Sequence, residues 1–329
     1  MAQKLLQLCI DWGTANLSAS YSLPSVDPER IENVRFRFIS EEAPMMAAMH
    51  EGHLVWGYDL QALILKHKVA AEDVIEFFKL ALYDQDGAQP ERVARVTAQL
   101  EQNNMSLDLL IQLHLRAVVD ECLREVRDSE DKLLTPGKML HELDVTDVGL
   151  RLSVPQMWSP TARRRMLQAA KLAGFTLVAL ASEPQCALAS LVNKVAKKTV
   201  RLPRPLLASD AVTAVDVGCG TTDIVTYRLV DDLSEHSRFE AVSQESGAFC
   251  AGQMVNDLLL DVFETSGEVA QRGGFRRVCN DLGITEHEGR RQALAEIERL
   301  KLEYERLPRY RICLLAPFKG EATFDSEFT

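Results

Sequence analysis

The chain has 329 residues, of which 47% are hydrophobic, with 17 glycines and 12 prolines. This composition excludes a disordered chain, and the length predicts two lobes. The formal net charge of -11 disfavours binding to nucleic-acid phosphate or to an anionic membrane surface, so we expect neither as a partner.

Seven cysteines are scattered singly along the chain, and no two have CxxC spacing. The spacing predicts neither a zinc site nor a disulfide framework, and it favours a reducing compartment. No segment approaches the roughly 20 apolar residues needed to span a bilayer. The amino terminus lacks the layout of a signal peptide, so we expect a cytoplasmic protein.

Strand and helix patterns alternate through the first part of the chain. Residues 4–10 and 15–23 predict a β-hairpin around Asp11-Trp12-Gly13-Thr14. Further strands are predicted over 34–39 and 53–58, helices over 59–68, 71–82 and 106–126, and a polar loop over 84–90.

The second part continues in the same style. Strands are predicted over 147–154, 175–181, 224–230 and 239–243, with a second hairpin spanning 211–229. Helices are predicted over 161–173, 183–195, 255–263 and 289–306, and residues 311–329 as one strand and a short tail. The basic, proline-containing stretch 194–205 indicates an exposed connection. We therefore place lobe I at residues 1–205 and a shortened lobe II at residues 206–329.

Two glycine turns, each opened by an aspartate at the end of an apolar strand, carry the strongest functional signal. In the first, Gly13 lets the backbone approach a phosphate, Thr14 adds a hydroxyl, and Asp11 is placed to hold Mg²⁺ through water. A plain hairpin turn would explain this motif equally well. The second turn has two glycines and two threonines between two aspartates: Asp216, Gly218, Gly220, Thr221, Thr222 and Asp223. A turn alone does not require so many such residues, and we interpret it as phosphate-binding.

Other charged residues have both a structural and a functional interpretation. Glu183 begins a helix, where an acidic residue suits the dipole, or else it orients magnesium-bound water. Lys79 extends to solvent from an apolar segment, or it reaches the γ-phosphate and positions the attacking water. Glu298 and Lys301 lie one helical turn apart and either pair with each other or contact a ribose or adenine edge. The run Arg163-Arg164-Arg165 is interpreted as a solvated helix face.

The chain resembles the nucleotide-binding domain of the 70-kDa heat-shock chaperones, within the actin-like ATPase superfamily. The similarity follows chain order through DWGT at 11–14, FFKL around Lys79, VPQMWSPTAR at 154–163, SEPQCAL at 182–188, DVGCGTTD at 216–223, a turn ending at Gly252, and ERLK at 298–301. The two glycine turns and the Glu-Pro pair between them are the most specific of these motifs.

The resemblance implies an α/β, ribonuclease H-like fold of two lobes, built on mixed sheets flanked by helices, with ATP or ADP and Mg²⁺ in an interlobe cleft. It implies that Asp11 and Asp216 bind hydrated Mg²⁺, supported by Asp223 and Glu183, and that Lys79 orients the hydrolytic water. Phosphate contacts would come from Gly13, Thr14, Gly218, Gly220, Thr221 and Thr222, and adenosine contacts from Glu298 and Lys301. Gly252 would also be a cofactor-binding residue. Pro155 and Arg163 would belong to an interlobe relay, and co-chaperones or client proteins would be partners.

Several positions depart from the family pattern. Cys219 replaces the central glycine of the second turn, Ala15 a hydroxyl-bearing residue, and Leu302 an arginine. The Gly-Gly adenosine turn that the family carries on a later strand is not found, so we expect a carboxyl-terminally truncated second lobe. Two alternatives to a chaperone-type ATPase therefore stay open. One is a non-catalytic interaction module with weak or no nucleotide binding, and the other is a small-molecule kinase of the same superfamily.

Overall fold

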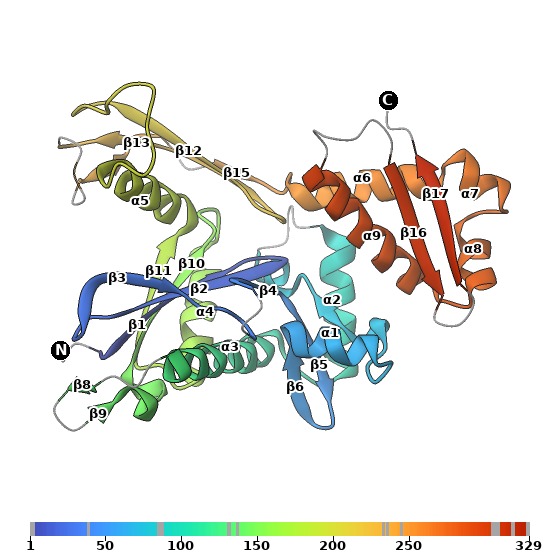
Figure 1. The fold of residues 1–329 in the computed structure, drawn as a ribbon, viewed down its shortest axis with the longest axis horizontal. Helices are drawn as coiled ribbons and strands as arrows, with labels where there is room; N and C mark the ends of the chain where they lie inside the picture. Colours follow the sequence, from blue (N-terminus) through green and yellow to red (C-terminus); the bar gives the residue numbers. More distant parts are fainter. Residues whose placement is uncertain are drawn as a thin grey trace. The chain divides into compact units, whose positions relative to one another are not determined.

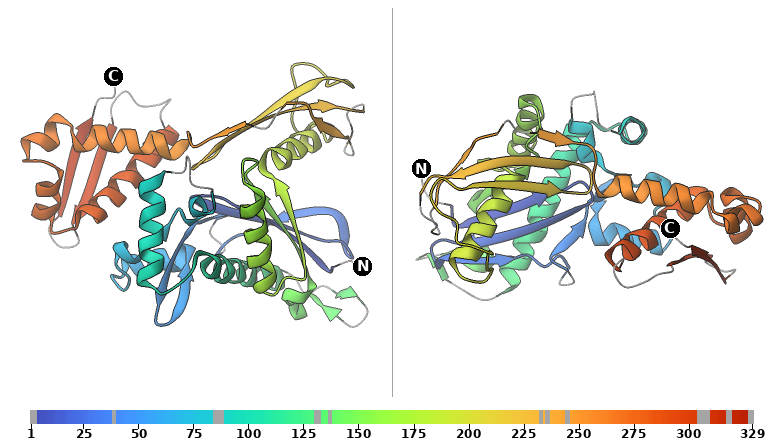
Figure 2. Two further views of the ribbon diagram at one scale, coloured as in Figure 1. Left: turned by 180° about the vertical axis from the view of Figure 1, so that it is seen from behind. Right: turned by 90° about the horizontal axis from the view of Figure 1, so that it is seen from above.

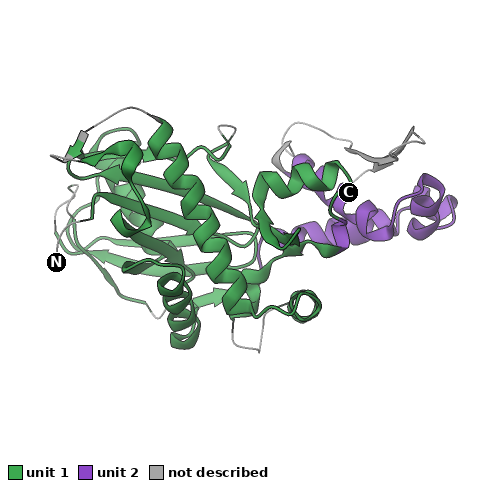
Figure 3. Ribbon diagram, turned by 90° about the horizontal axis from the view of Figure 1, so that it is seen from below, with its two compact units in different colours: residues 1–69, 73–249 green, residues 70–72, 250–329 purple. Residues whose placement is uncertain are grey.

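The computed structural model describes residues 4–37, 40–83, 89–129, 133–135, 138–231, 234, 237–243, 246–303, 310–316 and 320–326. The chain forms two units: unit 1 comprises Met1–Val69 and Asp73–Phe249, and unit 2 comprises Ala70–Glu72 and Cys250–Thr329 (Figure 3). Both contain helices and strands, which confirms the mixed α/β class. The units divide at residue 250 and not at the predicted lobe boundary of 206. Because lobes around a ligand need not coincide with compact units, that boundary stays a prediction.

A six-stranded mixed sheet forms the centre of unit 1. Its order is β11 (Leu177–Ser182), β10 (Val148–Val154), β1 (Leu6–Trp12), β2 (Asn16–Leu23) and β3 (Asp27–Asn33), with β4 (Glu42–Pro44) paired to β2. Strands β1, β10 and β11 are parallel, whereas β2 runs antiparallel to its neighbours. This arrangement puts the carboxyl ends of β1, β10 and β11 at the same edge of the sheet.

Alternation along the strands decides which face of this sheet is buried. In β1, Leu6, Leu8, Ile10 and Trp12 are buried, and the residues between them are not. The buried face packs against α3 (Leu107–Ser129) and α4 (Pro160–Leu172), as Figures 1 and 2 show. The apolar stripe of α3 meets the sheet, as its helical spacing predicts. Ser159 caps α4 by accepting a hydrogen bond from the Ala162 amide at 3.2 Å.

A second sheet in unit 1 carries the second hairpin. It consists of β12 (Ala211–Val217), β13 (Thr222–Leu229), β14 (Phe239–Ala241) and β15 (Ser246–Ala248), with β13 paired to the other three. Helix α5 (Glu183–Ala196) packs on it through Leu188 and Val192, which join Val225 and Tyr227 in a small core. This core keeps β12 and β13 in unit 1.

The rest of unit 1 includes two departures from the predicted elements. The remaining elements are β5 (Met46–His50), β6 (His53–Trp56), α1 (Gly57–Leu65), β7 (Ile75–Glu76), α2 (Pro90–Gln102), β8 (Leu133–Thr135), β9 (Lys138–Met139), and 3-10 helices at Phe78–Leu82, Leu140–Glu142 and Val145–Asp147. A further 3-10 helix, Ala71–Asp73, begins in the short segment that belongs to unit 2. The helix predicted over 71–82 is wrong, because β7 pairs with β5 and interrupts it. The strand predicted over 34–39 is also wrong. The apolar residues Val34 and Phe36 alternate with arginines because both apolar side chains are buried in the core. The backbone is not in a strand there, and only Phe36 forms an isolated bridge, to Ser40. Residues 38 and 39 of that range lie outside the described residues.

Unit 2 consists of helices and one strand pair. The elements are α6 (Gly252–Glu264), α7 (Gly267–Gln271), α8 (Phe275–Leu282), α9 (Glu286–Glu303), β16 (Tyr310–Ala316) and β17 (Gly320–Ser326). Phe263, Phe275, Val278 and Ile297 are the centre of its own core. The tail predicted after one strand is wrong, because β17 pairs antiparallel with β16. In β17 the polar residues Glu321, Thr323 and Asp325 alternate with the apolar residues Ala322 and Phe324, which is the period-2 pattern of a strand. Within the described residues of both units, no helix combines the length and the apolar character needed to cross a bilayer.

Candidate functional site

The two hairpins that carry the glycine turns have the same register. Asp11 lies opposite Ser18 in the first hairpin, and Asp216 lies opposite Asp223 in the second. The last paired residues before the turns are Trp12 with Leu17 and Val217 with Thr222, so the turns consist of residues 13–16 and 218–221. In both hairpins one residue separates the aspartate from the turn. The two Asp-Gly motifs of the sequence therefore also share one pattern of backbone pairing.

The first glycine of each turn faces a backbone carbonyl. A Cβ atom added to Gly13 would overlap the Asn16 carbonyl oxygen. A Cβ added to Gly218 would lie 3.3 Å from the Thr221 carbonyl oxygen, which accepts a hydrogen bond from the Gly218 amide at 2.9 Å. Both glycines let the chain fold back closely on itself, and the fit is tighter at Gly13.

The two turns meet inside unit 1. A Cβ on Gly220 would lie 2.8 Å from Thr14 Oγ1 and 3.1 Å from Leu80 Cδ2. The second turn therefore rests directly on the first and on the short helix that carries Lys79. The Thr14 and Thr221 side chains are buried, and Thr222 is the first residue of β13. The predicted phosphate-binding residues of unit 1 thus come from distant parts of the sequence to one place.

Carboxylates gather beside the turns. Asp11 Oδ1 accepts a hydrogen bond from Ser153 Oγ at 2.6 Å, because Ser153 is its register partner on the parallel strand β10. Burial raises the pKa of Asp216, and the nearby charge of Asp11 raises it further, whereas Lys79 lowers it. Burial likewise raises the pKa of Glu183. The charge of Lys79 lowers this pKa, and the charges of Asp11 and Asp216 raise it. These acidic groups lie close enough to repel each other, so a cation among them would be favoured.

Lys79 is the cation at this site. Its side chain is 3% exposed, and its Nζ donates to Glu183 Oε1 at 2.8 Å. The interpretation of Lys79 as a solvent-exposed lysine is therefore wrong. Phe77 has a left-handed backbone with φ of 59°, unfavourable by about 1–2 kcal/mol for such a residue, and the turn sends Phe78 into the core. Glu183 is held by the amino end of α5, whose second residue is Pro184.

Asp223 anchors the loop that follows β10. Its side chain is buried, and its Oδ1 accepts a hydrogen bond from the Met157 amide at 3.2 Å. Burial raises the pKa of Asp223, and the charge of Asp216 adds to this while the Met157 amide opposes it. Asp223 thus connects the second hairpin to residues 155–158.

Arg163 holds the same loop from the other side. Its guanidinium donates to the carbonyl oxygens of Pro155 at 3.2 Å, Gln156 at 3.1 Å and Trp158 at 3.2 Å. The interpretation of the arginine run as a wholly solvated face is therefore wrong for Arg163, while Arg164 is exposed. Pro155 and Arg163 form one structural unit, and their role in an interlobe relay stays a prediction.

Three side chains at this site were not singled out from the sequence. Ser153 could have been found, because it lies near the carboxyl end of a predicted strand, as Asp11 does. The two strands are parallel neighbours, and the two residues are partners in register. Tyr83 and Trp158 lie near Lys79 and Thr221, with the Lys79 Nζ 5.8 Å from the Trp158 ring centroid. Their aromatic character predicts burial and gives no signal of a place beside charged groups.

The predicted adenosine residues Glu298 and Lys301, and the predicted cofactor-binding residue Gly252, belong to unit 2. Gly252 is the first residue of α6. Lys301 Nζ donates to Glu298 Oε2 at 2.7 Å and to Asn256 Oδ1 at 3.0 Å, and Asn256 Nδ2 donates to Glu298 Oε2 at 2.8 Å. Glu298 and Lys301 therefore pair with each other, and their contact with adenosine stays a prediction.

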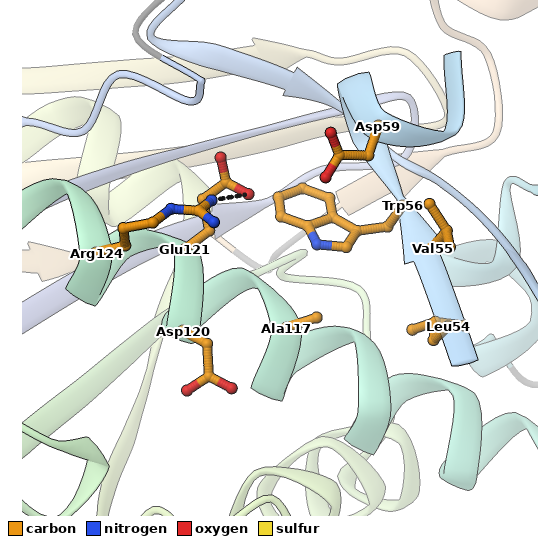
Figure 4. A pocket seen from close by; sticks show the side chains of 8 residues that line it. All are labelled: Leu54, Val55, Trp56, Asp59, Ala117, Asp120, Glu121 and Arg124. Carbon is orange, nitrogen blue, oxygen red and sulfur yellow. Dashed lines mark ion pairs between the residues drawn. The ribbon is translucent and has the colours of Figure 1, made fainter. Parts of the chain in front are cut away.

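A separate pocket of about 250 Å³ lies between β6 and α3 and contains none of the predicted site residues (Figure 4). Its lining residues are Leu54, Val55, Trp56, Asp59, Ala117, Asp120, Glu121 and Arg124. Its charged groups are largely paired: Arg124 with Glu121 at 3.1 Å, Asp59 with Arg37, and Asp120 with Arg116 at 2.9 Å.

A scan against models of known protein families finds no match for this chain, and a search of curated proteins also finds none. Among the described residues, no group of three or more His, Cys, Asp or Glu side chains is arranged to hold a metal ion.

Proposed function

We propose that the protein binds ATP with Mg²⁺ and hydrolyses it slowly to ADP, with an actin-like ATPase fold of the chaperone type. The observation that carries the proposal is the meeting of two equivalent Asp-Gly hairpin turns next to a buried lysine. Two turns related in register, joined at Gly220 and Thr14, suit one polyphosphate held from both sides.

The chemistry of the donors supports a phosphate ligand. The hydroxyls of Thr14 and Thr221 are hydrogen-bond donors, as are the amides of both glycine turns other than that of Gly218, which donates to Thr221, and Lys79 adds a buried positive charge. Such donors stabilise phosphate oxygens most strongly where little water competes with them. We propose that Lys79 leaves Glu183 to interact with the terminal phosphate.

The acidic groups fit a hydrated magnesium ion. Hard carboxylate oxygens are its preferred protein ligands, and the ion usually keeps several waters, so it does not need three protein ligands. Asp11 and Asp216 would hold it, with Glu183 and Asp223 supporting its waters. When bound, Mg²⁺ neutralises phosphate charge and relieves the repulsion between Asp11 and Asp216.

In the proposed reaction, water attacks the terminal phosphorus in line, the bond to the bridging oxygen breaks, and ADP and phosphate leave. Lys79 positions this water and stabilises the developing charge, and the Thr14 and Thr221 hydroxyls orient the phosphate. Positioning and electrostatics supply most of the acceleration in such transfers. The proposal extends to co-chaperone or client partners and to a cytoplasmic location.

Calorimetry and single-turnover hydrolysis with the full chain test the proposal. We expect Mg·ATP to bind the wild type, and Asp216→Asn or Lys79→Met to slow hydrolysis by about 10²–10³-fold. Asp128→Asn, which removes an exposed carboxylate from α3, is the matched control and should leave the rate unchanged.

Each other outcome identifies an alternative. No binding of Mg·ATP at millimolar concentration would exclude the ATPase. Binding without turnover would favour a non-catalytic module, and turnover that depends on an added sugar or carboxylic acid would favour a small-molecule kinase.

A further inference from the structure

Two buried polar groups beside the proposed phosphate site have no hydrogen-bond partner among the described residues. They are the indole N–H of Trp158 and the phenol O–H of Tyr83, in side chains that are 3% and 9% exposed. A buried donor without a partner costs free energy, so two of them in one place require an explanation. Their rings contact each other edge to face, with centroids 6.0 Å apart.

Both groups lie among the residues proposed to bind the terminal phosphate. The Lys79 ammonium lies 5.8 Å from the Trp158 ring centroid. Burial raises the pKa of the Tyr83 phenol, and the Glu183 and Asp223 charges add to the rise. Hydrogen bonding from the Thr221 and Trp158 side chains would oppose this rise in pKa, but the positions of their atoms place neither within hydrogen-bond geometry of the phenol.

The chemistry of the two groups restricts the missing partner. An indole N–H can only donate, so its partner must be an acceptor. Neither donor is in hydrogen-bond geometry with a carboxylate of the described residues, and Glu183 and Asp223 accept from Lys79 and from the Met157 amide instead. A phosphate group brings several acceptor oxygens that can take a donor from each side chain.

We propose that Trp158 and Tyr83 donate hydrogen bonds to the terminal phosphate and make the site prefer a nucleoside triphosphate over a diphosphate. This inference rests on the proposed function. The Lys79 ammonium lies over the Trp158 ring. A phosphate that takes Lys79 from Glu183 is therefore held beside both aromatic donors.

Binding of Mg·ATP and Mg·ADP to conservative variants of the full chain tests this assignment. Trp158→Phe and Tyr83→Phe keep the rings and remove only the donors. We expect each to weaken Mg·ATP binding about tenfold and to leave Mg·ADP binding unchanged. A merely structural role would weaken both nucleotides alike.

Matched controls come from the same unit. Trp56→Phe removes an indole N–H that also lacks a hydrogen bond to a described residue, and Tyr21→Phe removes a hydroxyl that donates to Glu32 at 3.1 Å. Neither should change the ATP-to-ADP affinity ratio. Tryptophan fluorescence gives a second readout, because Mg·ATP should change the emission of the wild type and of the Trp56 variant but not of the Trp158 variant.

The outcomes separate the inference from the proposed function. If the wild type binds neither nucleotide, both fail. If it binds both nucleotides and the two variants lose neither, or lose both equally, only the role of Trp158 and Tyr83 is overturned.

Discussion

At the scale of single residues, the absence of a Cβ atom lets the backbone of each glycine turn pass close to a carbonyl oxygen. Gly13 and Gly218 hold the same position in two hairpins of identical register. The carbonyl that faces Gly13 leaves no space for a methyl group, whereas the one facing Gly218 would be 3.3 Å away. Equivalent positions therefore differ in how strictly they require glycine.

This difference predicts unequal effects of one substitution. We expect Gly13→Ala to lower the free energy of unfolding of unit 1 by about 1–3 kcal/mol, because a backbone carbonyl must move. Gly218→Ala should cost less than about 1 kcal/mol, because a small shift suffices. Urea unfolding followed by tryptophan fluorescence measures both, since Trp12, Trp56 and Trp158 all lie in unit 1. Equal losses would contradict the turn geometry.

At the scale of elements, the loop between β10 and α4 is held from two sides. Asp223 accepts from its Met157 amide, and Arg163 donates to three of its carbonyls. The cap of α4 fixes the helix that carries Arg163. The loop thus links the second hairpin to α4, which explains how Trp158 is kept beside Lys79.

Replacing the guanidinium tests this link. We expect Arg163→Met to lower the free energy of unfolding of unit 1 by about 1.5–3 kcal/mol, because buried carbonyls lose charged donors. The Met157 amide should then exchange its hydrogen faster. Arg163→Lys should recover little, because an ammonium lacks the planar fork, and the exposed Arg164→Met is the control. Unchanged exchange at Met157 in Arg163→Met would count against the link.

At the scale of the whole molecule, the stability of unit 1 should depend on pH through one core histidine. His114 is fully buried among Trp12, Trp56 and Phe78, and its Nδ1 accepts the Trp12 indole N–H at 3.2 Å. Burial lowers the pKa of His114 from 6.5 to about 3. The unfolded chain therefore takes up this proton first. The stabilising effect of neutral His114 is complete above about pH 6.5 and is lost as the pH falls toward 3.

The expected slope is measurable. Below pH 6.5, His114 should reduce the free energy of unfolding of unit 1 by about 1.4 kcal/mol per pH unit. Comparing urea unfolding between pH 6.5 and 5 in the wild type and in His114→Gln isolates this contribution. The exposed His53→Gln is the control and should keep the wild-type slope. A His114→Gln slope equal to that of the wild type would show that His114 has the same pKa in the folded and unfolded chain.

The sequence alone determined the elements whose signal is local. Apolar periodicity located α3, α4, α5, α6 and α9 and the strands of both hairpins, because burial of one face imposes the period. The Asp-Gly-Thr patterns marked both turns, because tight turns restrict residue type. The strands β7 and β17 were misassigned because pairing with β5 and β16 overrode local preference, and the helices α2 and α8 were not predicted.

Only the tertiary structure decided which residues meet. Glu183 and Lys79 are far apart in sequence, and nothing local shows that the lysine is buried against that carboxylate. The contact of Gly220 with Thr14, the support of Asp11 by Ser153, and the unpaired donors of Tyr83 and Trp158 likewise depend on long-range packing. Local sequence restricts backbone conformation and residue type, whereas distances between remote side chains follow from how sheets and helices pack.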